Sequence, residues 1–571
     1  MNASILIVVV MFVFVMGYRF YTKFLVLGVF RSEDGAPTPA WQHPDSPDFS
    51  PCNRWQLLGY NAAASAGLVS ITGVGIAMIW GWIPAFLWII VGTLVAGGTY
   101  ALATLWASLR QSGNTLAGIA FDTAGVWAAL PMFFLGIALV VFLGALTCVL
   151  LGQLLQAHPE ASWIFLSLAA APGLIWRSAS SRSITAKFLW VSAALGLLAA
   201  GLILGQEYPL HFSGESTLVI NGIEVFRLPG ETPLVAVALA LAYHAIGTPV
   251  SGIARYRGVI VAILLIVLML VTGAGLLLSA PPVVAPDFNL DAALPNAFPL
   301  LFLVVSGGAV SGVYALVLTG TTVRQIGQAR DAPLISYGSV MLDGILAVLV
   351  LVVLSAGFTT TGEWSSMYDR WPEHAGVLVW LDLAVTKMGR FMAATGIPVP
   401  IAVGIVASVF AGMALTMLDS LLRALSYGVD EFVNDFELAY LRGNRYRDRI
   451  AAGIIVFATL WLLQVDLGLN HWLFFGLANQ LFAGCFLLVL SLILFRSANG
   501  AAFVLLPTLF VLTLALWGLG WLVINWWQQG EWILFILTCI VGFLAIVSLA
   551  ACTSAFLKVR QRRAATGAPG N

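Results

Sequence analysis

One carboxylate in this chain lies deep inside an apolar segment, where charge is most costly. Asp343 belongs to the apolar run 333–356 and has no basic residue within that run. A charged side chain inside a lipid-spanning segment is rare, so it marks a functional site by default. Such a carboxylate suits a proton carrier; the alternative is a structural carboxylate hydrogen-bonded to Ser, Tyr or backbone groups. We therefore treat Asp343 as a candidate for ion or proton coupling.

A second carboxylate, Asp419, lies in the apolar run 398–427, with Arg423 one helical turn beyond it. This spacing places the two side chains on one helix face and predicts an ion pair. Asp419 is accordingly either a second coupling group or half of a structural salt bridge near the cytoplasmic face. Arg423 is expected to be structural in both cases.

Hydroxyl and amide side chains mark two further apolar runs. Thr321 and Thr322 end the run 298–320. Their oxygens could bind Na⁺, a hard cation like those that favour oxygen ligands, or could hydrogen-bond to the helix end. Asn479 and Gln480 are adjacent amides inside the run 472–495, and we expect them to link helices structurally rather than to contact substrate.

Two runs are expected to be interrupted at mid-membrane, where freed backbone groups would face substrate or ion. The run 57–80 contains AAASAGLVSITGVGIAMIW, although small residues also permit close helix packing. The run 233–252 contains Pro249, which removes a backbone donor and kinks a helix. His244 in the second run is a proton or substrate ligand or, alternatively, a satisfied buried histidine. The candidate substrate-binding residues here are Gly67, Ser70, Thr72, Gly73, His244 and Thr248.

The overall composition is that of an all-α polytopic membrane protein. Of the 571 residues, 60% are hydrophobic and 9% are charged, and the mean hydropathy is +0.97. A soluble globular protein carries about 25% charged residues. The five cysteines show no paired spacing, and most lie in apolar runs, where they are expected to act as small hydrophobes.

A membrane-spanning helix needs about 20 mostly apolar residues. The first run has neither the preceding basic residues nor the cleavage site of a signal peptide, so it is expected to remain as a span. Two runs are short, so the count lies between 13 and 17. We expect fifteen spans, at 3–22, 57–80, 82–107, 126–156, 162–176, 188–205, 233–252, 258–280, 298–320, 333–356, 398–427, 449–464, 472–495, 502–525 and 532–556.

The positions of the basic residues predict the orientation of the spans. With fifteen spans the two termini lie on opposite sides of the membrane. If the basic C-terminal segment is cytoplasmic, 22 of the 26 Lys and Arg residues fall on the inner side. This distribution is the positive-inside pattern, and it predicts an outer N-terminus and an inner C-terminus. The four outer exceptions are Arg227, Arg370, Lys387 and Arg390.

Three segments outside the spans have recognisable patterns. Residues 206–232 contain Asn221-Gly222, a two-residue hairpin signal. Residues 358–397 predict an interfacial amphipathic helix, with a sixteenth span as the alternative. Residues 428–449 predict a short cytoplasmic helix.

No segment has the composition of a separate soluble domain. Residues 1–556 are therefore expected to form a single transmembrane transporter domain, followed by a cytoplasmic tail at 557–571. The sequence has no nucleotide-binding loop, metal-ligand cluster or nucleophile elbow. We expect no enzymatic activity, no nucleic-acid partner and no cofactor other than bound Na⁺ or H⁺.

A set of motifs resembles the carbon starvation protein A (CstA) family of bacterial inner-membrane transporters, which is grouped with the amino acid–polyamine–organocation superfamily. Any one of these motifs is weak evidence for the family, but seven motifs in the same order along most of the chain are specific evidence for it. The matching residues are Tyr18-Arg19-Phe20-Tyr21; Thr38-Pro39-Ala40 with His43, Asp45 and Asp48; Leu58-Gly59 with Ala66-Gly67 and Gly73; Phe298-Pro299 with Gly308-Ala309-Val310-Ser311-Gly312 and Gly320-Thr321-Thr322; Tyr337-Gly338 with Asp343; Thr416, Asp419 and Arg423; and Phe475-Gly476-x-Ala478-Asn479-Gln480.

The chain differs from the family pattern at several ionisable positions, so it resembles a divergent member. The family usually has a histidine pair where Tyr60 and Asn61 stand, and a histidine where Tyr314 stands. The family tends to have Glu at the position of Asp343. Asn61 and Tyr314 join the candidate substrate-binding residues on this ground.

The resemblance implies secondary active uptake of small nutrients across the bacterial inner membrane. Family substrates are mainly peptides and, for some members, pyruvate with protons, so a peptide, an amino acid or pyruvate coupled to H⁺ or Na⁺ is expected. The superfamily core has two inverted five-helix repeats, which we place at 57–205 and 233–427, with the site between the second and seventh spans. The alternative is a nutrient sensor that binds its ligand without coupled flux.

Overall fold

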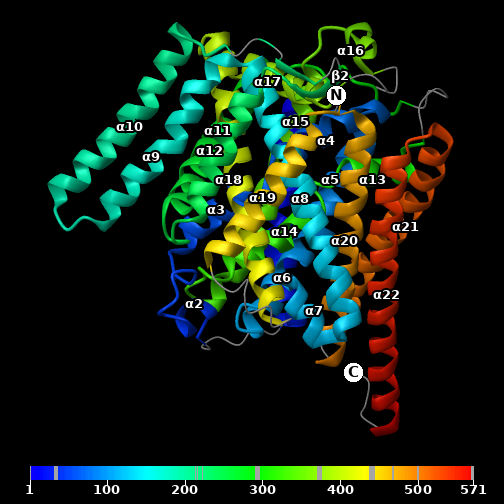
Figure 1. Ribbon diagram of the computed structural model, residues 1–571. Coiled ribbons are helices and arrows are strands. Elements are labelled where there is room, and N and C mark those ends of the chain that lie inside the picture. The colour runs from blue at the N-terminus through cyan, green and yellow to red at the C-terminus, as the bar shows by residue number, and fades with distance from the viewer. Residues whose placement is uncertain are drawn as a thin grey trace.

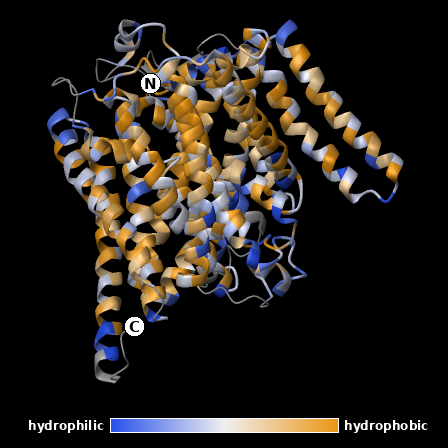
Figure 2. Ribbon diagram, turned by 180° about the vertical axis from the view of Figure 1, so that it is seen from behind, coloured by the Kyte–Doolittle hydropathy of each residue, from blue (hydrophilic) through white to orange (hydrophobic). Residues whose placement is uncertain are grey.

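The protein is built almost entirely of helices, which stand side by side in one bundle (Figure 1). The computed structural model describes residues 2–30, 37–211, 214, 216–220, 223–289, 296–368, 376–435, 444–465, 468–497 and 500–566. The helices are largely apolar along their length, with polar residues gathered towards the ends of the bundle (Figure 2). In the described part, ten helices are long and apolar enough to cross a membrane, or eleven if one bent pair counts as a span.

Each of the fifteen expected spans coincides with a helix or a broken helix, although the count of fifteen stays a prediction. The uninterrupted helices are α1 (Ala3–Gly17), continued by the π-helical turns η1 (Tyr18–Thr22) and η2 (Leu25–Phe30); α5 (Trp82–Val91) and α6 (Gly98–Arg110), joined by the π-helical η4 (Gly92–Gly97); α8 (Val126–Ala157); α9 (Ser162–Ser180); α10 (Ile184–Glu207); α11 (Thr232–Ile246); α12 (Ile253–Ser279); α15 (Ala332–Ala356); α18 (Val399–Asp435); α19 (Asn444–Leu462); α20 (Leu469–Arg496); α21 (Ala502–Gln529); and α22 (Trp532–Thr566).

Two spans are interrupted. The first consists of α3 (Arg54–Ser65) and α4 (Leu68–Ala77), which continues as the 3₁₀ turn η3 (Met78–Trp80) and bends by 47° from α3. The second consists of α13 (Ala297–Val304) and α14 (Gly312–Val317), which continues as the π-helical η6 (Leu318–Thr322), with residues 305–311 non-helical between them.

The expected interruption at Pro249 is wrong. Helix α11 ends at Ile246, and Pro249 lies in the turn that leads into α12. The residue before a proline is pushed towards extended backbone, which favours ending a helix over bending it. The second interruption lies instead beside Gly308, whose φ of +73° favours glycine.

The two ends of the bundle carry different short elements (Figure 1). The N-terminus, strand β2 (Ile223–Leu228), α16 (Thr361–Tyr368) and α17 (Leu378–Ala393) lie at one end, and α2 (Pro39–Gln42), α7 (Leu116–Ala124) and the end of α22 lie at the other. The expected spans cross the membrane in alternating directions, and this alternation predicts the same grouping of the segments between them. The side that faces the cytoplasm stays a prediction.

The expected hairpin is confirmed. Strands β1 (Ser216–Ile220) and β2 pair antiparallel with Ile220 opposite Ile223. The turn residues Asn221 and Gly222 lie outside the described residues. A separate helix over 428–449 is wrong, because the described parts of this segment continue α18 and begin α19.

Helix α17 is fixed to the end of α8 by a cluster around His158. The His158 ring lies between two carboxylates, with Nε2 2.8 Å from Asp382 Oδ1 and Nδ1 3.3 Å from Glu160 Oε1. Burial lowers the pKa of His158, but the hydrogen bonds and charges of Asp382 and Glu160 outweigh burial and raise that pKa to about 9. The imidazolium therefore joins α17, through Asp382, to the rest of the bundle.

This cluster predicts a pH-dependent stability. Because the pKa of His158 rises above its ordinary value of 6.5 on folding, the cluster stabilises the protein fully below that pH and loses its effect as the pH rises through about 9. We expect His158→Gln to reduce the free energy of unfolding at pH 6 by about 1–3 kcal/mol. A lower thermal midpoint in detergent measures this loss. The deficit should shrink above pH 9; a deficit that is constant across this range would contradict the assignment.

The orientation is testable by cysteine labelling in a cysteine-free background. Asn221→Cys should react with a membrane-impermeant maleimide added outside intact cells, because residues 206–232 are expected to be external. Arg445→Cys should react only after the membrane is opened. The reverse pattern would overturn the outer placement of the N-terminus.

Candidate functional site

The two interrupted helices meet inside the bundle, backbone against backbone. A Cβ atom on Gly73 of α4 would lie 2.4 Å from the carbonyl oxygen of Val304, the last residue of α13. A Cβ atom on Gly307 would lie 2.5 Å from Ser70 Oγ. Only glycine permits this approach, so both breaks belong to one junction.

Asp343 of α15 holds the non-helical segment 305–311 in place. Its Oδ2 accepts hydrogen bonds from the backbone N–H of Gly308 at 3.0 Å and from the Tyr314 hydroxyl at 2.7 Å. Asp343 is fully buried, and its Oδ1 makes no hydrogen bond of normal geometry with the described residues. The Ser70 hydroxyl of α4 also lies against this carboxylate, so Asp343 links the segment 305–311 to the first interrupted helix.

Two amides on α20 satisfy backbone groups that the break in α13–α14 leaves open. Asn479 Oδ1 accepts from Gly312 N–H at 2.8 Å, and Gln480 Nε2 donates to the carbonyls of Phe302 and Val310 at 3.2 and 3.0 Å. In a hydrocarbon environment such groups need internal partners. We expected Asn479 and Gln480 to link helices outside the transport core, and in the structure they connect α20 to both halves of the interrupted helix α13–α14.

The first turns of α4 and α14 both begin at this junction, and they differ in capping. Ser311 Oγ accepts from Val313 N–H at 3.3 Å and caps α14. Helix α4 follows Gly67 without a side-chain cap. A helix N-terminus carries partial positive charge and unpaired N–H groups, which suit an anion. Hydroxyls around the junction are buried without a hydrogen bond of normal geometry among the described residues, namely those of Ser65, Ser70, Thr72 and Ser306.

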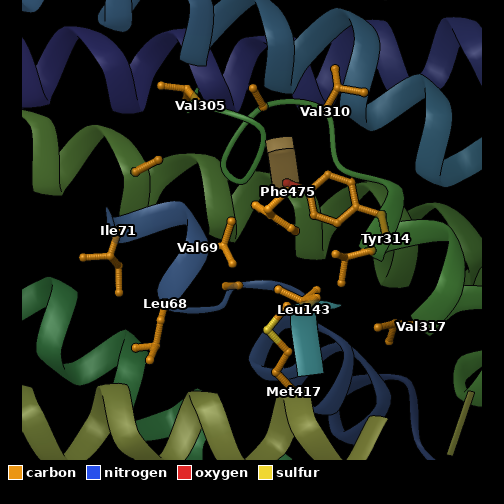
Figure 3. Close-up of a cluster of buried hydrophobic side chains, with 14 of the residues drawn as sticks. Leu68, Val69, Ile71, Leu143, Val305, Val310, Tyr314, Val317, Met417 and Phe475 are labelled. Carbon is orange, nitrogen blue, oxygen red and sulfur yellow. The ribbon is translucent and has the colours of Figure 1, made fainter. Parts of the chain in front are cut away.

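Apolar side chains from several helices surround the junction (Figure 3). Val69 on α4, Leu143 on α8, Met417 on α18 and Phe475 on α20 gather there with Tyr314. A Cβ on Gly67 would approach the Met417 sulfur to 2.4 Å. The site thus combines a few polar groups with an apolar lining, as binding sites for small molecules generally do.

A second polar network lies between α3, η6 and α15. Thr322 donates its hydroxyl hydrogen to Asn61 Oδ1 at 2.8 Å, and Asn61 Nδ2 donates to Ser339 Oγ at 2.5 Å and to the Ile335 carbonyl at 3.3 Å. Thr321 donates to the Val317 carbonyl of its own helix at 3.0 Å, which is the local alternative to a cation ligand. Asn61 and Thr322 therefore join three elements rather than facing the junction.

The expected pairing of Asp419 with Arg423 is wrong. Asp419 forms a buried ion pair with Arg257 of α12, because α12 and α18 pack against each other and Arg257 lies between them. Arg423 instead donates to the carbonyls of Ala245 and Thr248 at 2.7 and 3.2 Å. Those carbonyls lie at and just beyond the end of α11, where a helix leaves acceptors without partners. Asp419 is thus already neutralised by Arg257.

His244 and Thr248 lie apart from the second break. His244 is exposed, and Thr248 donates its hydroxyl hydrogen to the Ala245 carbonyl at 2.7 Å. His244 lies in the last turn of α11 and Thr248 follows that helix, which packs on α18, α8 and α19. Sequence reasoning missed the role of Gly308; the adjacent glycines Gly307 and Gly308 were the signal that could have located the break.

Comparison with known proteins identifies the family. A family model described as "Carbon starvation protein CstA" matches residues 2–370 and 372–518. The chain belongs to the CstA family. The family is one of membrane transporters rather than enzymes, as the names of its members show.

Relatives of this CstA family member are distant. It is 23% identical to the peptide transporter CstA of Bacillus subtilis over 96% of both chains. It is 24% identical to the pyruvate/proton symporter BtsT of Escherichia coli over 60% of its own length and 48% of BtsT. Most of the other matched relatives are likewise aligned over about half of their length. A solved structure of the nucleobase-cation-symport-1 transporter Mhp1 covers 93% of the chain and 96% of Mhp1, with a TM-score of 0.48 and 13% identity.

The contact between the two breaks predicts a strong effect of one methyl group. Gly73→Ala should push Val304 away and destabilise the protein by about 1–3 kcal/mol, a typical cost of overpacking. The thermal midpoint in detergent measures this effect. Gly273→Ala in α12 is the matched control, because a Cβ there meets nothing within 4 Å. Equal midpoints for the two variants would contradict the contact.

Proposed function

We propose that this CstA family member is a secondary active transporter of the bacterial inner membrane, with its N-terminus outside and its C-terminus in the cytoplasm. It takes up a small nutrient that bears a carboxylate, such as a peptide, an amino acid or pyruvate, coupled to H⁺ or Na⁺. The observation that carries the proposal is the position of Asp343, a fully buried carboxylate whose Oδ2 holds the break in α13–α14.

Coupling follows from the two roles of this carboxylate. An ionised Asp343 accepts the bonds from Gly308 and Tyr314 as charge-assisted hydrogen bonds, which are stronger than neutral ones. Binding of a proton or Na⁺ at Oδ1 removes or balances that charge and weakens the hold on the segment 305–311. Because this segment borders α4, ion binding changes the shape of the substrate site, and the two equilibria are linked.

The substrate carboxylate binds at the N-terminus of α4. That end is uncapped and is bordered by the Ser70 hydroxyl, whereas α14 already has Ser311 as its cap. Apolar side chains such as Leu143 and Phe475 receive the rest of the molecule (Figure 3). The names of the relatives support this chemistry, since peptides and pyruvate all carry a carboxylate.

We place the start of the second inverted repeat at the interrupted helix α13–α14 instead of residue 233, and keep the start of the first repeat at the interrupted helix near residue 57. Asn289, which precedes α13, donates its N–H to the Trp80 carbonyl at the end of η3. This bond ties the end of the first interrupted span to the segment that leads into the second, which supports opposite directions for the two spans. Discontinuous helices in corresponding positions of inverted repeats are the usual place for a transporter site.

Asp343→Asn should abolish gradient-driven accumulation and leave counterflow exchange intact, since the amide keeps the side-chain size but cannot gain or lose the coupling charge. Uptake of labelled dipeptides, amino acids and pyruvate into proteoliposomes with an imposed H⁺ or Na⁺ gradient measures this. The matched control is Asp331→Asn, which changes a carboxylate at the start of the same helix that faces an exposed Arg54.

Two results would overturn the proposal in different ways. Accumulation that is unchanged in Asp343→Asn would remove this residue from coupling. Ligand binding by the wild-type protein without flux under either gradient would identify a nutrient sensor instead.

A further inference from the structure

A groove in the side of the bundle lies between the first helix and α15. It has a volume of about 840 Å³, and Leu58 of α3 also lines it. Val15 and Leu27 on the first helix are 52% and 64% exposed, so the groove opens sideways, towards lipid in a membrane. Its lining is largely apolar, with Arg19 and Lys23 as its charged residues.

These two cations have no counterion in the part of the chain that the structure describes. Arg19 and Lys23 are four residues apart at η1, and both are exposed. Neither forms an ion pair with any of the described residues. Two neighbouring positive charges repel each other unless an anion lies close to both, so this end of the groove is suited to a phosphate.

The groove has the dimensions of one lipid leaflet. Arg19 lies about 24 Å along the helix from Ala3 at roughly 1.5 Å per residue. A hydrocarbon core about 30 Å thick places that side chain close to its inner boundary, which a long cationic side chain reaches by extending outward. From Pro333 to Ile345 the groove follows α15 for about 18 Å, close to the half-thickness of the core. In the proposed orientation this is the cytoplasmic leaflet.

A second apolar groove of similar size has a different set of charged residues. It measures about 870 Å³ between α8, α19, α20 and α22. Arg449 is the charged residue among its lining, and Asp448 precedes it in the sequence. The groove at α15 differs because it has two cations, and neither of them is adjacent to a carboxylate in the sequence.

We propose that the groove between the first helix and α15 binds an anionic phospholipid. Its phosphate lies between Arg19 and Lys23, and one acyl chain follows the apolar side of α15 towards Ile345. The lipid contacts Leu58 of α3, the half-helix whose Asn61 is bonded to α15 and η6. Its presence therefore stabilises the position of α3 beside the junction. The binding itself does not depend on which substrate is transported.

Lipid titration of the purified full-length protein tests this inference. Phosphatidylglycerol and phosphatidylcholine with identical acyl chains are added in neutral detergent, and bound lipid is counted by native mass spectrometry alongside the thermal midpoint. Phosphatidylglycerol should bind selectively and raise the midpoint. The double variant Arg19→Gln, Lys23→Gln should bind it about 30-fold more weakly, since each basic residue near a charged lipid surface contributes on the order of 1 kcal/mol.

Three further measurements test whether binding needs the two cations of this groove, the open groove itself, and a lipid instead of free phosphate. Arg449→Gln, in the second groove, should keep the wild-type preference for phosphatidylglycerol. Val15→Trp, which fills the groove and keeps both charges, should lose binding. Inorganic phosphate should not reproduce the stabilisation. Equal binding of the two lipids, a preference that survives in the double variant, or full replacement by phosphate would each overturn the proposal.

Discussion

Backbone groups inside a membrane have no water to bond, and this constraint governs the centre of the protein. Interrupting two helices at one level exposes N–H and carbonyl groups that a continuous helix would satisfy. The chain supplies their partners from neighbouring helices, with Asp343 from α15 and with Asn479 and Gln480 from α20. The start of α4 has no side-chain cap, and we propose that the substrate carboxylate binds there.

Much of the architecture could be predicted because lipid imposes a simple rule on length and polarity. The apolar run 333–356 became α15 at Ala332–Ala356, within one residue. The cost of a buried charge similarly singled out Asp343, which the structure places at the junction. Both inferences use local properties of the sequence, and neither needs knowledge of which helices are neighbours.

Features that depend on neighbours could not be predicted. Asp419 has Arg423 at the right spacing on its own helix, yet Arg257 on α12 is its partner, because the packing of α12 against α18 decides the pairing. Pro249 was the more conspicuous helix breaker, but the break at Gly308 is held open by Asp343 from another helix. Such a break is stable only where tertiary partners exist, and a single sequence does not reveal them.

The glycine contacts around α13 have a mechanical consequence. A Cβ on Gly73 or Gly476 would approach backbone carbonyl oxygens of α13 to 2.4 or 2.1 Å, and one on Gly97 would approach the carbonyl of Ala309 in the break to 2.0 Å. Between bare backbones there are no side chains that can change rotamer to absorb a displacement. We therefore expect this region to move by rigid-body sliding or rocking of whole segments past one another, and not by gradual local deformation.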